Sequence, residues 1–199
     1  MPKPKEFGGD RVHSQIEDEE VRIADSTVEV SSAWDKNGKP IFDNLSTYSE
    51  NTVNIPQQYY SRLFDGYITH NHPTGKMFSP DDVGFAVMQG LKEIRAVSPD
   101  GESFVLEKVW KELSPTQLRF IRHYRDFAEL QRDLVASRFE QKEANKVWTK
   151  TVASWMKENA SKYGYKFRVE KLSESKLSKV RQRRKEEEEE LRELLGGNS

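Results

Sequence analysis

Two histidines separated by a single residue, His70 and His72, lie at the end of an apolar run, and Ser79 and Asp82 follow after a short loop. Side chains of a strand alternate between its faces, so both imidazoles can point to the same side and reach one ion. An aspartate on the first turn of the next helix can add a third ligand and leave a position open for water, as catalytic zinc requires. The His/His/Asp set suits zinc better than magnesium or calcium. The sequence therefore predicts a Zn²⁺ site formed by His70, His72 and Asp82.

The same stretch has the features of a helix start. Ser79 is a good N-cap, Pro80 suits the first helical position, and Asp82 suits the first turn because of the helix dipole. The segment "SPTQ" at 114–117 uses the same device where no chemistry is expected. Two interpretations of Ser79 stay open: a helix cap only, or a cap that is also a catalytic group.

The elements around this stretch predict an α+β fold. The pattern gives an antiparallel hairpin around an Asn-Gly turn, a short strand with a helical turn, a strand that ends at Pro73, a helix from Ser79, and two strands around a Pro-Asp-Gly turn. Such an order favours a mixed, largely antiparallel sheet with flanking helices. The hairpin strands are predicted at 27–34 and 40–43.

The second half of the chain is predicted to be mainly helical. Long helices are expected within 114–162, followed by Gly164 as a C-cap and a last strand in "YKFRVEKL". We divide the chain into a flexible lead-in (1–15), a metal-binding domain (16–172) and a charged helical tail (173–199). The tail has two possible interpretations: a solvated helix stabilised by i to i+4 ion pairs, or an arm that binds nucleic acid. Its mixture of basic and acidic residues favours the solvated helix.

Composition limits the classes of function. The 199 residues fit one domain with appended helices, and the net charge of −1 gives no reason to expect nucleic acid or an anionic membrane as a partner. The chain has no cysteine, which excludes disulfides and thiolate ligands. No apolar stretch has the length of a signal peptide core or a membrane span, so a soluble, cytoplasmic protein is expected.

The motif His70-Asn-His72-Pro, a spacer, and Ser79-Pro-Asp-Asp82 resembles the signature of the JAMM (MPN+) metalloproteases. "HNHP", "FSPDD" and "EIRAV" (93–97) together resemble a bacterial and phage branch, often linked to phage head morphogenesis. The resemblance implies a JAMM-like fold, a layered mixed sheet similar to that of cytidine deaminases, with C-terminal helices added. It also implies that His70, His72 and Asp82 bind zinc and that Ser79 stabilises the oxyanion. An upstream glutamate is the general base, with Glu29 on the first predicted strand as first choice and Glu20 as the fallback.

Two classes of function follow from this resemblance. The first is a zinc-dependent hydrolase that cuts a peptide or isopeptide bond of a peptide or protein substrate, with metal-bound water as nucleophile. The second is a phage virion or assembly protein with a structural or vestigial metal site, whose helices and tail contact phage structural partners. The two remaining histidines, His13 and His123, are expected to be structural or solvated, and Trp110, Trp148 and Trp155 to be packing anchors.

Overall fold

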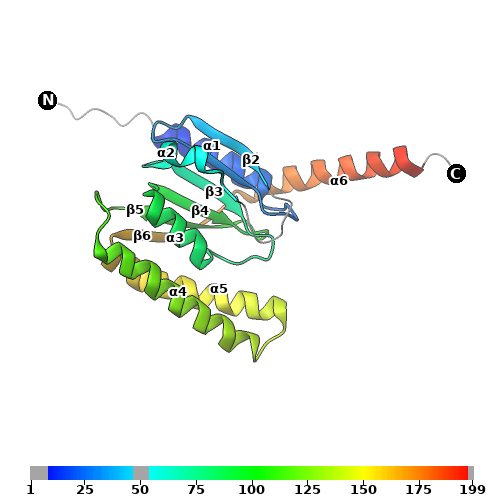
Figure 1. Ribbon diagram of the computed structural model, residues 1–199. Coiled ribbons are helices and arrows are strands. Elements are labelled where there is room, and N and C mark those ends of the chain that lie inside the picture. The colour runs from blue at the N-terminus through cyan, green and yellow to red at the C-terminus, as the bar shows by residue number, and fades with distance from the viewer. Residues whose placement is uncertain (1–8, 47–53, 197–199) are drawn as a thin grey trace.

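The computed structural model describes residues 9–46 and 54–196, and these form a mixed sheet flanked by helices (Figure 1). The sheet has the strand order β2-β1-β3-β4-β5-β6. Only β3 and β4 pair in parallel, and the other neighbouring strands of the described sheet are antiparallel. The predicted α+β class with a mixed sheet is therefore confirmed. The strands are β1 (Ser31–Trp34), β2 (Pro40–Leu45), β3 (Tyr67–Asn71), β4 (Glu93–Val97), β5 (Glu102–Lys108) and β6 (Tyr165–Lys171).

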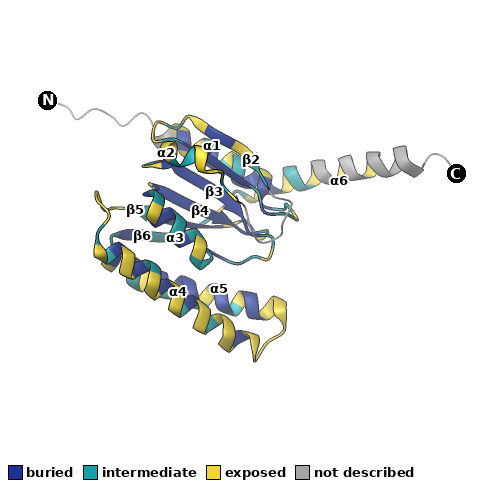
Figure 2. Cartoon of the chain, in the orientation of Figure 1, coloured by how far each residue is buried: buried dark blue, intermediate teal, exposed yellow. Residues whose placement is uncertain are grey.

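Helices cover both faces of the sheet. One face carries α1 (Gly9–Ile23) and the first turns of α6 (Glu174–Gly196). The other face carries α3 (Pro80–Gln89), α4 (Pro115–Ala136) and α5 (Gln141–Asn159), and the main core lies beneath them. Shorter helical turns are η1 (Gln57–Tyr59), α2 (Tyr60–Leu63) and η2 (Ala160–Tyr163). Figure 2 shows the inner strands β3 and β4 buried between these layers and the outer side of α4 exposed.

The alternation of the strands explains the two faces. Ile68 on β3 and Ile94 on β4 point into the main core, whereas Thr69 and Arg95 point to α1. The face toward α1 is partly polar, and its buried Glu20 accepts hydrogen bonds from Thr69 and Arg95. This alternation matters for function because it fixes which side chains can meet at the end of β3.

The predicted hairpin is confirmed, with shifted bounds. Asp35 holds the turn: its carboxylate accepts from the backbone N–H of Asn37 and of Lys39, and Gly38 takes a positive φ of 78°. β1 begins only at Ser31, so Glu29 lies in the segment before the strand and not on it. The strand predicted before the helical turn has its first residues, 51–53, outside the described residues, while Asn54 and Ile55 are irregular.

The prediction of a flexible lead-in up to residue 15 is wrong from Gly9 onward. Helix α1 begins there, and Val12 and Ile16 are almost fully buried against Trp34 and Tyr67. Because Val12 and Ile16 are four residues apart, they lie on one side of the helix. The apolar stripe is short and set among charged residues, which made the helix hard to recognise.

The charged tail is helical, as predicted, but its first turns are not simply solvated. Leu177 is 1% exposed and packs with Val21 and Val97. Arg181 binds the carboxylate of Asp25 and donates to the carbonyl of Pro99. These contacts attach the start of α6 to α1 and the sheet. None of the described helices combines the length and the apolar character that crossing a bilayer requires.

Candidate metal and catalytic site

Four titratable side chains converge at the end of β3. Glu29, His70, His72 and Asp82 each offer a ligand atom, and these atoms all lie within 4.8 Å of one another. His70 comes from β3, His72 follows its last residue, Asp82 lies on the first turn of α3, and Glu29 precedes β1. The structure thus brings together the three predicted ligands and the preferred glutamate.

The spacing of the ligand atoms fits one zinc ion. Nε2 of His70 lies 3.0 Å from Nε2 of His72, and these two atoms lie 3.6 and 3.4 Å from the Asp82 oxygens. Ligands about 2.1 Å from a tetrahedral zinc are about 3.4 Å from one another. Although the two histidines approach different oxygens of Asp82, Oδ1 and Oδ2, the separations are close to those of neighbouring zinc ligands, and the chemistry of the three side chains suits that ion.

Hydrogen bonds orient two of these ligands. Nδ1 of His72 donates to the carbonyl of Lys76 at 2.9 Å, which leaves its Nε2 lone pair for a metal. Asp82 belongs to a full capping box: its carboxylate accepts from the Ser79 N–H at 2.6 Å, and its own N–H donates to the Ser79 hydroxyl at 3.2 Å. The helix cap therefore fixes Asp82 in front of the histidines. Tyr124 of α4 steadies this loop by donating to the carbonyl of Phe78.

The electrostatics of the cluster separate the roles of its two carboxyl groups. Burial opposes ionisation of Asp82, but the charge of His70 and the hydrogen bonds of both histidines hold the pKa of Asp82 well below its usual range. Burial also opposes a charged His72, yet the hydrogen bond and charge of Asp82 raise the pKa of His72. Burial raises the pKa of Glu29, against the opposite influence of the two histidines. Asp82 is thus kept in the carboxylate form that a metal ligand needs, while the pKa of Glu29 is shifted in the direction that proton transfer near neutral pH needs.

Asn71, between the two histidines, is a positioning residue that the sequence did not reveal. Its side chain is fully buried and points to the opposite face of β3. It accepts from the N–H of Val30 at 2.7 Å and donates to the carbonyls of Ser26 and Val28. Asn71 therefore fastens the segment that carries Glu29. The only sequence signal was its place between the histidines, which by alternation puts it on the other face.

The fallback base, Glu20, lies outside this cluster. It is fully buried on the α1 face, where it accepts from Arg95, Thr69 and Ser103. Because its carboxylate accepts hydrogen bonds from one guanidinium and two hydroxyl groups, Glu20 has a structural role in the core. Choosing between Glu20 and Glu29 required knowing which face of the sheet each residue joins.

The other predicted non-site residues have structural contacts. His13 lies 3.5 Å from the Glu93 carboxylate, and His123 shares a hydrogen bond of 2.7 Å with the Tyr163 hydroxyl. Trp148 donates to the carbonyl of Ala128, and Trp155 stacks on Phe127. These contacts agree with the expected structural roles.

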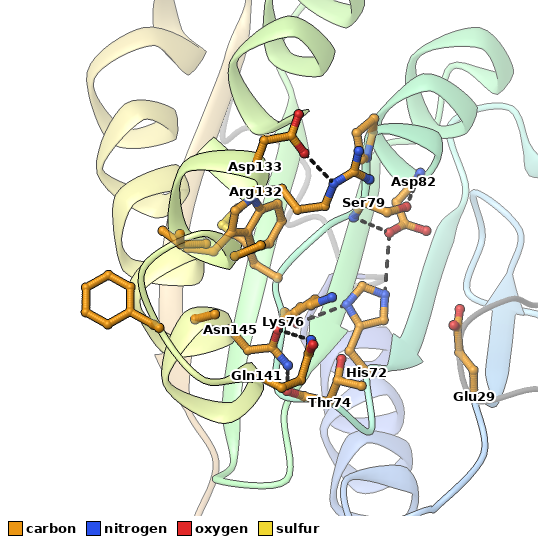
Figure 3. A pocket seen from close by; sticks show the side chains of 17 residues that line it. Glu29, His72, Thr74, Lys76, Ser79, Asp82, Arg132, Asp133, Gln141 and Asn145 are labelled. Carbon is orange, nitrogen blue, oxygen red and sulfur yellow. Dashed lines mark hydrogen bonds and ion pairs between the residues drawn. The ribbon is translucent and has the colours of Figure 1, made fainter. Parts of the chain in front are cut away.

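Two hollows open beside the cluster and share Glu29, Ser79 and Asp82 in their walls. One, of about 440 Å³, extends to the hairpin of α4 and α5 and includes His72 (Figure 3). The other, of about 300 Å³, extends past His70 to Tyr60 and Phe85. The cluster therefore borders two hollows, each large enough for a ligand larger than water.

The double interpretation of Ser79 can be resolved because the chain contains a second capping box. Ser114 caps α4 through Thr116 and Gln117, remote in its contacts from the cluster. Each serine-to-alanine change is expected to cost about 1 kcal/mol of unfolding free energy, measured by urea denaturation. If the site has the hydrolytic activity that the motif predicts, only Ser79→Ala should also reduce it, by about 10²-fold, because the Ser79 hydroxyl borders the Glu29, His70, His72 and Asp82 cluster. If both variants keep wild-type turnover, Ser79 is a cap and nothing more.

Comparison of the chain with protein-family models, curated proteins and solved structures gave no match. Membership of the JAMM family therefore stays a prediction from the motif.

Proposed function

We propose that the protein is a zinc-dependent hydrolase of peptide or isopeptide bonds. His70, His72 and Asp82 hold the ion and Glu29 transfers protons. One observation carries the proposal: a buried glutamate lies within 4.8 Å of three side chains that are spaced as zinc ligands, at a site open to two hollows. A purely structural zinc site fills all four positions with protein ligands and needs neither a proton acceptor nor access.

Zinc in this site would supply Lewis acidity, which acidifies water and polarises a carbonyl group. Glu29 takes the proton of the attacking water, whose oxygen forms a bond with the carbonyl carbon. The same carboxyl then gives that proton to the leaving nitrogen as the C–N bond breaks. The Ser79 hydroxyl, at the border of both hollows, can donate to the carbonyl oxygen as negative charge develops.

The shape of the site supports a polypeptide substrate. The two hollows share Glu29, Ser79 and Asp82 and otherwise have different walls, so an extended chain that lies across these three residues would find space for its residues in both hollows. A substrate bound in this way would have its scissile bond beside Glu29 and the neighbouring residues in the two hollows.

The first test is zinc content. Protein purified without chelator is expected to carry about one zinc ion per chain by mass spectrometry, and the double change His70→Ala and His72→Ala should remove it. His123→Ala is the matched control, because that histidine bonds Tyr163 and should leave the zinc content unchanged.

The outcome also separates the two proposed classes. A wild-type protein free of zinc contradicts the hydrolase and the metal site together. Zinc that is bound without hydrolysis of any member of a proteome-derived peptide pool favours the second class, a phage assembly protein with a structural site.

A further inference from the structure

The larger hollow, here named the hairpin pocket, has one wall whose residues have no role in the proposed metal binding or proton transfer. That wall is formed by the end of the α4–α5 hairpin and the loop after His72. Its polar residues Lys76, Arg132, Gln141 and Asn145 surround the same hollow as His72 and Asp82 (Figure 3). Its apolar residues are Met77, Val135, Ala136, Phe139, Ala144 and Trp148.

Lys76 stands in this pocket without an anionic partner. Within the described part of the chain, no carboxylate lies at ion-pair distance from its ammonium group, although its side chain is half-buried. Burial and then the charge of Arg132 lower the pKa of Lys76, because the two positive charges repel each other. Asp133 lies 3.6 Å from Arg132, but both side chains are mostly exposed, and such pairs contribute little.

The wall formed by α4 and the loop after His72 therefore has an excess of about one positive charge, since Lys76 and Arg132 face one carboxylate there, that of Asp133. A half-buried cation without a counterion is unfavourable in the free protein and becomes favourable when an anion binds. The opposite side of the pocket is negative because it holds Glu29 and Asp82. An incoming anion is thus directed away from the cluster and toward α4, with the apolar wall in contact with the rest of the ligand.

We propose that the hairpin pocket binds a carboxylate of the substrate, next to the bond that is cut. The carboxylate belongs to an aspartate or glutamate side chain or to a free C-terminus, and its aliphatic neighbours lie on the apolar wall. The single excess positive charge of this wall matches one carboxylate better than a doubly charged phosphate, and the nearby Glu29 and Asp82 would repel the second charge more strongly. This inference rests on the proposed hydrolase function and adds the substrate class to it.

Binding of synthetic peptides to the zinc-loaded Glu29→Gln variant tests the pocket without turnover. Two pools of N-acetylated, C-amidated peptides differ only in a central glutamate or glutamine, and a third pool has the glutamine and a free C-terminus. We expect about tenfold tighter binding, by calorimetry, for the glutamate pool, the free C-terminus pool or both over the neutral pool. Combining Lys76→Met with Arg132→Met should abolish the difference.

The control is Arg122→Met, which removes an exposed arginine of the same helix and should keep the preference. Equal binding of all three pools, no binding of any, or a preference that survives in the Lys76/Arg132 variant overturns the inference. Wild-type hydrolysis without acid preference would reject the pocket alone. Acid-selective binding without hydrolysis by the wild type would reject the hydrolase alone.

Discussion

Replacing Glu29 by glutamine is expected to lower peptide hydrolysis by roughly 10²–10⁴-fold while zinc content stays at the wild-type level. Glutamine keeps the shape of the side chain but cannot accept the proton of the attacking water. The side chains of the three proposed ligands, His70, His72 and Asp82, should remain in place, since none of their hydrogen bonds within the described part of the chain involves the Glu29 carboxyl. Turnover of the proteome-derived peptide pool and metal analysis of the same sample check both halves of this prediction.

Two outcomes would assign a different role. If zinc is lost along with activity, Glu29 is a fourth ligand and the site is closed. If hydrolysis persists, proton transfer belongs to another group. Glu129→Gln, an exposed glutamate of α4, is the matched control and should leave both measurements unchanged.

Replacing Arg95 by methionine is expected to destabilise the protein by about 3–5 kcal/mol, because buried carboxylates lose their cation. Arg95 is 5% exposed and donates to Glu20 at 2.7 Å and to Glu93 at 3.1 Å, and it also binds Glu170. Burial alone would raise the pKa of Glu93, but His13, Arg95 and Arg168 together hold it at about 2. Urea denaturation at fixed zinc concentration measures the loss.

Neutralising Glu20, the buried carboxylate that Arg95 binds, provides the control. Adding Glu20→Gln to Arg95→Met should recover part of the lost stability, since the stranded anion is then neutral and still hydrogen-bonded by Thr69 and Ser103. A loss below about 1 kcal/mol for Arg95→Met, or no recovery in the double variant, would contradict a structural role for Glu20.

The part of the site that could be predicted from the sequence is the part made by local contacts. His70 and His72 share a side because strands alternate, and Asp82 is held by a cap that its own neighbours form. The α+β class followed in the same way from the order of strands, turns and helices. Local geometry repeats between proteins, so residue type and spacing were sufficient there.

The remaining features depend on contacts between distant segments. Glu29 reaches the histidines because β1 pairs with β3, with Ser31 opposite His70, and because Asn71 holds the segment before β1. The place of Glu20 depends on Arg95, far along the chain. Spacing carries no information about either contact, which is why two glutamates stayed open as the base. The hairpin pocket was missed for the same reason, since α4 and α5 return to the site only in the folded protein.

The three proposed zinc ligands, His70, His72 and Asp82, lie within one stretch of 13 residues, which affects how strongly zinc can stabilise the folded state. Closing a short loop costs little entropy, so an unfolded chain can gather the same ligands around zinc. A metal that also binds the unfolded state stabilises the native state by less than its native affinity implies. The melting temperature should therefore respond weakly to added zinc, even where the folded protein binds the ion tightly.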